Sequence, residues 1–330
     1  MPALNPIPKD AKIYIAGHRG LVGSALFRHL SSLGFTNLIG WTSAELDLRK
    51  EVETFSAIRE AKPEVIFMAA ARVGGIMANS TYPVEFLNDN IRMQTNIFEA
   101  AHAADVPRLL FLGSSCIYPK MASQPISEDS LLTGPLEETN EAYAIAKIAG
   151  VLQVQSYRRE YGRAWISAMP TNLYGPGDNY DLETSHVLPA LIRRFHEAKM
   201  SELPSVTMWG TGSPLREFLH SDDLASACLR LLENYDQPQP INIGWGNDIS
   251  IHDLAILIAE VVGFQGQIVW DPSKPDGTPR KLLNTRKLNS IGWQPKISLD
   301  AGIRNTYLCY VKSLNSKVSI QKADLPSCDN

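Results

Sequence analysis

Residues 13–23 read Ile13-Tyr14-Ile15-Ala16-Gly17-His18-Arg19-Gly20-Leu21-Val22-Gly23, a short apolar run that leads into three glycines at GxxGxxG spacing. The apolar run predicts a buried strand, and the amphipathic pattern that follows predicts a helix. Between a strand and a helix, glycines allow a tight turn and the close approach of a pyrophosphate, which the helix N-terminus then favours. The stretch therefore predicts a dinucleotide-binding cradle made of Gly17, His18, Arg19, Gly20, Leu21, Val22 and Gly23.

Short aliphatic runs alternate with longer amphipathic stretches from Lys12 to Met169. This pattern is typical of parallel strands joined by crossover helices, so we expect an α/β fold with a Rossmann-type doubly wound parallel sheet. The expected strands are residues 13–16, 37–41, 65–69, 108–112 and 165–169. The expected helices are residues 21–33, 51–61, 83–104 and 141–161.

Beyond Pro170, prolines and glycines punctuate shorter elements, which is typical of a loop-rich lobe that carries ligand contacts. We expect residues 1–170 and about 217–246 to form the cofactor-binding domain. Residues 171–216 and 247–314 would form a smaller α/β substrate-binding lobe. A last helix is expected from Leu299 to about Ser313, followed by a flexible polar tail at residues 315–330.

The composition is that of an ordinary globular chain, with 330 residues, 44% of them hydrophobic, and a net charge of −4. Acidic and basic residues are intermixed without a basic stripe, which argues against nucleic acid as a partner. No window approaches ~18 consecutive apolar residues, so we expect no membrane partner and a cytoplasmic location. The cysteines are far apart and lack CxxC spacing, which argues against a disulfide framework and a metal site. They are Cys116, Cys228, Cys309 and Cys328.

The end of the second expected strand normally decides between the two nicotinamide cofactors, because an acidic side chain there holds a ribose hydroxyl. Here the residues are Trp41-Thr42-Ser43, with no carboxylate to repel a 2′-phosphate, and Arg19 in the cradle is able to pair with one. The sequence therefore favours NADP(H). Two alternatives stay open: Arg19 forms only a surface ion pair, or Glu45 or Asp47 serves the ribose.

Tyr143 and Lys147 are four residues apart, so they lie on the same face of a helix about one turn apart. A phenol with a pKa near 10 is a poor proton shuttle, and a nearby ammonium brings it towards neutrality. A second candidate, Ser114, follows the fourth expected strand, at the sheet edge where ligands bind. The group Ser114, Tyr143 and Lys147 predicts reductase chemistry beside a nicotinamide, whereas the alternative for the pair on the helix is a solvated surface.

With these motifs, the chain resembles the extended short-chain dehydrogenase/reductases that remodel nucleotide sugars. The likeness extends from about Lys12 to about Tyr310. Within this family it is similar to members that convert GDP-4-dehydro-6-deoxy-D-mannose to GDP-L-fucose, by epimerisation at C3 and C5 and then NADPH-dependent reduction of the C4 ketone. The runs that carry the resemblance are GHRG (17–20), ARVGGI (71–76), GSSCIYP (113–119), YAIAKIAG (143–150), PTNLYGP (170–176) and WGTG (209–212).

The resemblance implies that Cys116 and His186 move the carbon protons during epimerisation. A thiol with a pKa near 8.5 and an imidazole near 6.5 suit this work near neutral pH. Related sugar dehydratases carry a glutamate base and an aspartate where this chain has Cys116 and Ser115, so a dehydratase lacks its acid and base here. Taken without the family, Cys116 would be a small buried residue and His186 the start of a helix.

The resemblance also implies which residues hold the ligands. Arg194, Trp209 and Arg216 match substrate-binding positions, and an arginine fork suits a diphosphate. Asp276 and Lys281 fall in another matching run and would reach the sugar or the ribose, the alternative being a charged surface loop. The residues expected beside the nicotinamide are Pro170, Thr171, Asn172, Leu173, Lys147 and His186.

Two departures from the family qualify these expectations. Many relatives place arginines after the second strand, where this chain has Trp41 and Ser43, so the preference for NADP(H) depends largely on Arg19. The segment at residues 234–240 is shorter than in some relatives, which would alter only a surface turn.

Two other functions stay open at this point. One is a nucleotide-sugar 4-ketoreductase without epimerase activity, against which Cys116 and His186 argue. The other is a non-enzymatic dinucleotide sensor, against which Ser114, Tyr143 and Lys147 argue. The family also suggests a homodimer, with the long helices at residues 83–104 and 141–161 as candidate interfaces.

Overall fold

A computed structural model describes residues 6–274 and 276–323, and its core is a six-stranded sheet. The strand order is β2-β1-β3-β4-β5-β9, and every neighbouring pair is parallel. This confirms the expected doubly wound α/β fold. The strands are β1 (Ile13–Ala16), β2 (Leu38–Ile39), β3 (Val65–Met68), β4 (Arg108–Leu112), β5 (Ala164–Pro170) and β9 (Ile241–Ile243).

Helices cover both faces of this sheet, and each face has its own apolar core. On one face lie α1 (Leu21–Ser32) and α7 (Ser221–Asn234), which pack together. On the other lie α2 (Glu51–Ala61), α4 (Pro83–Ala103) and α5 (Glu141–Tyr161). In that second core Trp165 is fully buried, and its indole N–H donates to the Val106 carbonyl at 3.0 Å. Burying such a side chain stabilises the fold by roughly 2–3 kcal/mol.

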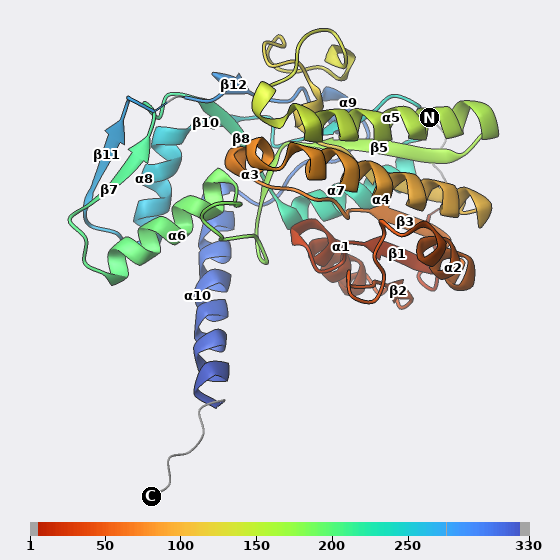
Figure 1. Cartoon of the computed structure of the whole chain (residues 1–330), viewed down its shortest axis with the longest axis horizontal. Coiled ribbons are helices and arrows are strands. Elements are labelled where there is room, and N and C mark those ends of the chain that lie inside the picture. The colour runs from red at the N-terminus through yellow and green to blue at the C-terminus, as the bar shows by residue number, and fades with distance from the viewer. Residues whose placement is uncertain (1–5, 275, 324–330) are drawn as a thin grey trace, which may run out of the picture.

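A smaller lobe lies beside the open end of the sheet, at the left of Figure 1. Its core is lined by α6 (Val187–Met200), α8 (Ile251–Val262) and α10 (Leu299–Ala323). Two small sheets complete the lobe. One pairs β7 (Ser205–Trp209) with β11 (Gln267–Asp271), and the other joins β6 (Asn172–Tyr174), β8 (Leu215–His220), β10 (Asp248–Ser250) and β12 (Arg280–Lys281).

Short helical turns connect these elements. Two of them are the α-helices α3 (Ile76–Thr81) and α9 (Arg286–Ser290). Three more are single 3₁₀ turns, η1 (Ser115–Ile117), η2 (Glu128–Ser130) and η3 (Glu138–Asn140). The sequence signals did not predict α3, because six residues are too few for helical periodicity to emerge. The proposed division into two domains at residues 170, 217 and 246 stays a prediction.

Most expected element bounds agree with the structure to within one or two residues. Even within this margin, the strand expected at residues 37–41 is shortened to the two residues Leu38–Ile39. This strand is at the edge of the sheet and pairs on one side only, so fewer of its residues are held in a ladder. After it, the Trp41 ring turns aside and packs at 4.7 Å from the Tyr14 ring.

The last helix is longer than expected, whereas the flexibility expected of residues 315–330 stays a prediction. Helix α10 continues to Ala323, well past the expected end near Ser313, and Figure 1 shows it running down from the lobe. The physical reason is that no proline or glycine interrupts the chain between Gly302 and Pro326, so nothing in the sequence stops the helix. Residues 324–330, with Cys328, lie outside the described residues.

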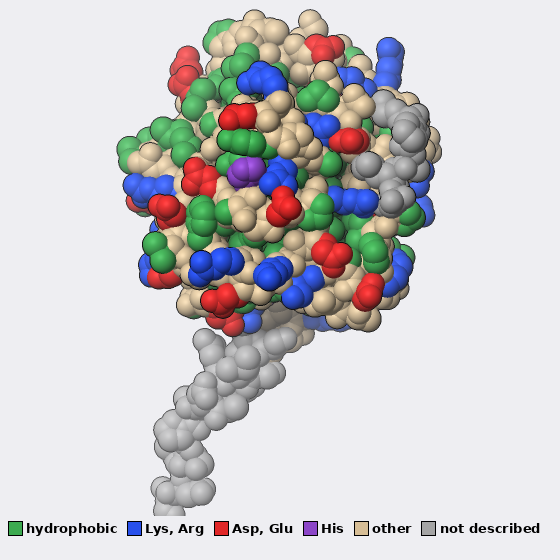
Figure 2. Space-filling view, turned by 90° about the vertical axis from the view of Figure 1, so that its right-hand side faces the viewer, with side chains coloured by type: hydrophobic (Ala, Val, Ile, Leu, Met, Phe, Trp, Pro, Cys, Tyr) green, Lys and Arg blue, Asp and Glu red, His purple; other side chains and the backbone are tan. Residues whose placement is uncertain are grey.

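The surface seen in Figure 2 carries basic and acidic side chains side by side, without a continuous basic patch on that face. Within residues 6–274 and 276–323, no helix has an apolar stretch of the length that a bilayer requires.

Candidate active site

Ser114, Tyr143 and Lys147 meet at the carboxyl end of β4. Ser114 follows this strand and caps η1, where its hydroxyl accepts from the Cys116 amide at 3.2 Å. The hydroxyl groups of Ser114 and Tyr143 share a hydrogen bond. One turn further along α5, the Lys147 ammonium lies 5.8 Å from the centre of the Tyr143 ring. The structure therefore brings the three side chains together at the sheet edge where ligands bind in this fold.

Lys147 is a buried cation with a fixed position. Its Nζ donates to the Leu112 carbonyl at 2.8 Å and lies 4.8 Å from the centre of the Phe111 ring. Only 3% of the residue is exposed, and this burial lowers the pKa of Lys147 to about 7. An ammonium whose proton is held this weakly changes charge near neutral pH.

Tyr143 departs from the expectation that a nearby ammonium lowers its pKa. Burial raises the pKa of Tyr143, the charge of Cys116 raises it further, and only the hydrogen bond with Ser114 acts in the other direction. The expectation overlooked burial, because a buried phenol loses the water that would stabilise its anion. Tyr143 is therefore a protonated phenol at neutral pH, which is the form that donates a proton.

Cys116 lies within the same group and its sulfur is not isolated. The Asn140 side-chain amide nitrogen lies 3.6 Å from the Cys116 Sγ atom. The Lys281 ammonium nitrogen, which comes from β12, lies 3.5 Å from the same sulfur. Cys116 is partly exposed, so the alternative of a fully buried structural cysteine does not hold. Its position, two residues after Ser114, opens it to whatever the Ser114 and Tyr143 hydroxyls bind.

His186 is the residue that precedes the first turn of α6. His186 is an exposed residue, but the protein around its ring displaces part of the water, and this desolvation, with a smaller contribution from the charge of Lys281, lowers the pKa of His186. The loop before it is held by the run at residues 71–76, since the Gly75 amide donates to the Thr184 carbonyl at 2.8 Å. The same charge of Lys281 thus reaches Cys116 and His186, which lie on different elements.

Two positions of the glycine cradle between β1 and α1 leave no space for a side chain. Gly17 has a φ of +80°, and a Cβ there would lie 2.8 Å from the Ala70 Cα atom. A Cβ on Gly23 would lie 2.1 Å from the Gly17 carbonyl oxygen, so both positions require glycine. No side chain caps the N-terminus of α1, and the buried His18 Nδ1 atom has no partner within the described chain. These features fit a dinucleotide.

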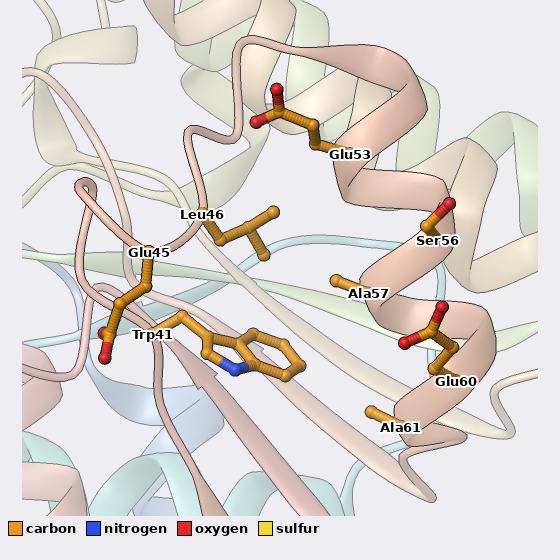
Figure 3. A pocket seen from close by; sticks show the side chains of 8 residues that line it. All are labelled: Trp41, Glu45, Leu46, Glu53, Ser56, Ala57, Glu60 and Ala61. Carbon is orange, nitrogen blue, oxygen red and sulfur yellow. The ribbon is translucent and has the colours of Figure 1, made fainter.

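The segment after β2 forms a hollow of about 590 Å³ against α2. Figure 3 shows the Trp41 ring and the Leu46 side chain directed towards Ala57 and Ala61 of α2, with Glu45 on the opposite side. The Glu45 carboxylate accepts from the Thr42 amide at 2.7 Å and from its hydroxyl at 2.8 Å, and these bonds lower the pKa of Glu45. Trp41 therefore packs within the fold, and the Glu45 carboxylate stabilises the turn at residues 42–45.

Arg19 is exposed at the cradle, close enough to Glu45 for its charge to contribute to the lowered pKa of that carboxylate. No ion pair joins Arg19 to a carboxylate in the described part of the chain, so its guanidinium is available to an added anion. Asp47 forms an ion pair with Arg49 at 2.8 Å, which occupies this other candidate for the ribose.

The run Pro170, Thr171, Asn172 and Leu173 passes from β5 into β6. The Thr171 hydroxyl and the Asn172 amide both donate to the Glu217 carbonyl, at 3.3 and 2.8 Å. The Glu217 carboxylate is fully buried and accepts from the Gly246 and Leu283 amides, at 2.6 and 3.1 Å. Glu217 was not predicted from the sequence, and it ties together the segments that line the cleft.

Two of the expected substrate residues, Arg216 and Asp276, are neighbours. Burial lowers the pKa of Arg216, while the charges of Glu137 and Asp276 act against this. The Asp276 carboxylate accepts from the Thr211 amide at 2.9 Å and its hydroxyl at 2.7 Å, so it closes the loop at residues 210–212. Asp276 is thus already engaged with protein. Arg216 Nη1 donates to the Leu215 carbonyl at 2.8 Å, and the other guanidinium N–H groups form no hydrogen bond within the described residues.

Arg194 and Trp209 lie on adjoining elements of the lobe. One guanidinium nitrogen of Arg194 is 3.4 Å from the Thr207 carbonyl on β7. At the end of that strand, 60% of Trp209 is exposed, and the Lys274 ammonium lies 5.7 Å from a ring centre of its indole. A Trp with this exposure offers a flat apolar surface. Lys281, on β12, contacts Cys116.

Asn140 is a site residue that the sequence analysis missed. It precedes α5, three residues before Tyr143, and its amide nitrogen faces the Cys116 sulfur. Its side-chain oxygen is buried and has no partner within the described residues, which leaves an acceptor for a ligand hydroxyl. The available signal was its spacing from Tyr143 on the helix.

Comparison with known proteins agrees with this site. The model of the NAD dependent epimerase/dehydratase family matches residues 13–244, which span the cradle and the Ser114, Tyr143 and Lys147 group.

Two curated relatives match nearly the whole chain. GDP-L-fucose synthase 1 of Arabidopsis thaliana is 57% identical over 306 residues, covering 93% of this chain and 95% of its own. GDP-L-fucose synthase of Escherichia coli K12 is 50% identical over 311 residues, covering 92% and 97%. Among solved structures, a GDP-L-fucose synthetase from Naegleria fowleri bound to NADP has a TM-score of 0.89 at 28% identity, covering 96% of this chain and 97% of its own.

Proposed function

Because this chain belongs to the NAD dependent epimerase/dehydratase family, we propose that it converts GDP-4-dehydro-6-deoxy-D-mannose to GDP-L-fucose, the activity named for its relatives. The reaction epimerises C3 and C5 of the sugar and then reduces the C4 ketone with NADPH. The observation that carries this proposal is the position of Cys116. A residue with a mobile proton lies two positions after Ser114, beside the reductase group Ser114, Tyr143 and Lys147.

The glycine cradle and the run after β5 would hold the cofactor. The residues are Gly17 to Gly23 for the pyrophosphate, and Lys147, Pro170 to Leu173 and His186 for the nicotinamide side. When bound, the cofactor supplies a hydride. NADP(H) is the preferred form because the exposed Arg19, which forms no ion pair within the described residues, favours a 2′-phosphate. The Glu45 and Asp47 carboxylates that follow β2 are already engaged with Thr42 and Arg49.

For the reduction, Tyr143 gives its hydroxyl proton to the oxygen on C4. Its raised pKa keeps the phenol protonated, and the hydrogen bond with Ser114 orients it. Loss of that proton leaves a phenolate, which the Lys147 ammonium stabilises from one turn away. Lys147 thus contributes most after the proton has moved.

For the epimerisation, a base removes the proton from C3 or C5 and the electron pair moves to the C4 oxygen as an enolate. Ser114 and Tyr143 stabilise this charge by hydrogen bonding to the oxygen. Cys116 and His186 are the two groups that exchange protons with the carbons. They lie on different elements, η1 and the start of α6, so they approach the sugar from different directions.

The nucleotide would extend into the lobe. Arg216 keeps guanidinium donors free for the diphosphate, Arg194 lies beside β7, and the exposed Trp209 ring offers a stacking surface. Asp276 acts through the loop at residues 210–212, which it closes. This arrangement supports a nucleotide sugar and does not by itself select guanine.

A homodimer through α4 and α5 is part of the proposal. Both helices expose large apolar side chains, among them Val84 at 67%, Ile145 at 41% and Leu152 at 44%. Exposed apolar side chains on adjacent long helices favour a helical interface. The cytoplasmic location stays a prediction.

The decisive assay is NADPH oxidation with GDP-4-dehydro-6-deoxy-D-mannose, followed by identification of the sugar product. We expect stoichiometric conversion to GDP-L-fucose. A product with unchanged configuration at C3 and C5 would favour the 4-ketoreductase. Cofactor binding without NADPH consumption would favour the dinucleotide sensor.

A further inference from the structure

The sulfur of Cys116 has two hydrogen-bond partners within the described chain, and both are donors. One is the Lys281 ammonium, 3.5 Å from Sγ, and the other is the Asn140 amide nitrogen, 3.6 Å from Sγ. An ammonium has no lone pair and cannot accept from a thiol. The surroundings of the sulfur therefore stabilise a negative charge on it.

We propose that Lys281 is a positioning residue that holds Cys116 as a thiolate before the sugar binds. The inference rests on the proposed function for the use of that thiolate, and it changes the expected role of Lys281 from a contact of the sugar or ribose to a partner of the base. The thiolate takes the proton from C3 or C5, and the electron pair of the C–H bond moves to the C4 oxygen. His186 returns a proton to the carbon as the electron pair moves back from the C4 oxygen, and the thiol then releases its proton to water.

The backbone on both sides of Lys281 is firmly held. In β12, Lys281 pairs with Arg216 of β8. The Gln124 side chain bridges its two neighbours, since it donates to the Arg280 carbonyl at 3.1 Å and accepts from the Leu282 amide at 2.9 Å. Arg280 in turn pairs with Asp248. The lysine therefore extends from a fixed strand, which is what precise placement of one charge requires.

The charges around the sulfur agree with this role. No carboxylate within the described residues forms an ion pair with Lys281, so its charge is not neutralised before it reaches the sulfur. From α5, Tyr143 faces Cys116, and a charge on the sulfur raises the pKa of that phenol. From the residue before α6, His186 faces the same ammonium, and desolvation of the ring, with a smaller contribution from that charge, lowers the pKa of the imidazole. A thiolate thus also helps to keep Tyr143 protonated for the reduction.

Alkylation by iodoacetamide tests the proposal without any substrate, because only the thiolate reacts. The rate at Cys116 would be followed by mass spectrometry between pH 5.5 and 9. We expect Lys281→Met to slow the reaction at pH 7 by about tenfold and to move its pH dependence upwards. Lys281→Arg keeps a cation and should restore most of the rate. The control Lys50→Met removes a cation that pairs with Glu53 on the surface, and should leave the rate unchanged.

An unchanged rate and pH dependence in Lys281→Met, with the native unfolding temperature and NADPH affinity, would overturn the inference. The same variants would then be turned over in heavy water, where we expect the pH profile of deuterium entry at C3 and C5 to move upwards in Lys281→Met only. Absence of deuterium in the unaltered protein would instead overturn the proposed function. The two failures are therefore distinguishable.

Discussion

The Lys147 ammonium nitrogen lies 2.8 Å from the carbonyl oxygen of Leu112, the last residue of β4. This bond joins α5 to the strand end from which Ser114 continues. Because Tyr143 is one helical turn before Lys147, fixing the lysine also fixes the phenol beside Ser114. The group Ser114, Tyr143 and Lys147 is therefore oriented by the edge of the sheet.

Replacing the phenol tests its role as proton donor. We expect Tyr143→Phe to lower the rate of ketone reduction by about 10²–10⁴-fold, since the C4 oxygen loses its general acid. NADPH affinity should stay near the native value in fluorescence titration. Tyr161→Phe, at the exposed end of α5, is the matched control and should behave as the native protein. Equal losses in both variants would show that a change to the helix, and not the proton, matters.

The glycine cradle makes a prediction with an internal control. Gly23→Ala places a Cβ 2.1 Å from the Gly17 carbonyl oxygen, so we expect at least a tenfold loss of NADPH affinity, or loss of folding. Gly134 lies outside the cradle, and Gly134→Ala places its Cβ 3.4 Å from the Pro119 Cβ atom, on a backbone without a positive φ. It should bind with less than a threefold change, and its thermal unfolding should remain native. Comparable binding by both variants would contradict the steric argument.

Asp178 makes the stability of the fold depend on pH. One carboxylate oxygen is buried and has no partner among the described residues, and burial raises the pKa of Asp178 to about 7. The folded state therefore holds the proton more tightly than the unfolded state. This tighter proton binding contributes to the free energy of unfolding. The contribution is complete below the unfolded pKa of 3.8 and is lost as the pH rises through about 7.

We accordingly expect the free energy of unfolding of Asp178→Asn to be higher than that of the native protein at pH 8, by on the order of 2 kcal/mol. Near pH 4 the two free energies should be equal. Urea titrations at both pH values would measure this. Asp181 lies in the same loop, but hydrogen bonds from Thr184 and Glu183 lower the pKa of its carboxyl group. Asp181→Asn should therefore be less stable than the native protein at pH 8. A gain in both variants would contradict the assignment of the effect to burial.

Cys116→Ser separates the two reactions of the site. A serine hydroxyl is a far weaker base than a thiolate, so we expect epimerisation to fall much more than ketone reduction. Release of deuterium from substrate labelled at C3 or C5 would report the first reaction, and NADPH oxidation with an already epimerised keto sugar the second. An equal loss of both would mean that Cys116 supports the whole site and not the carbon protons in particular.

The sequence predicts best where a local pattern determines a local structure. The strand at Ile13–Ala16 and the helix at Glu141–Tyr161 agree with the structure residue for residue, because buried periodicity specifies both. The contact between Lys281 and Cys116 could not be predicted, because it joins residues 165 positions apart through a two-residue strand. The lowered pKa of Tyr143 was predicted wrongly because burial, which no spacing reports, outweighs the nearby charge.

The remaining candidate site residues came from the family resemblance, and in the structure they differ in burial and in hydrogen bonding. Arg216 lies partly buried with donors to spare, whereas Asp276 is engaged with Thr211. Trp41, which occupies a position where relatives carry an arginine, packs against Tyr14. Asn140 was missed because an amide before a helix is usually a cap, and its contact with sulfur comes from tertiary structure.

The central claim is that one site both moves carbon protons and reduces the ketone, and turnover in heavy water tests it most directly. GDP-4-dehydro-6-deoxy-D-mannose would be converted with NADPH in deuterated buffer, and each ring carbon of the product examined by NMR, with substrate alone in the same buffer as the control for spontaneous exchange. The account predicts deuterium at C3 and C5 and none at C4, which receives its hydrogen from the cofactor. A reduced product without deuterium at C3 and C5 would contradict it.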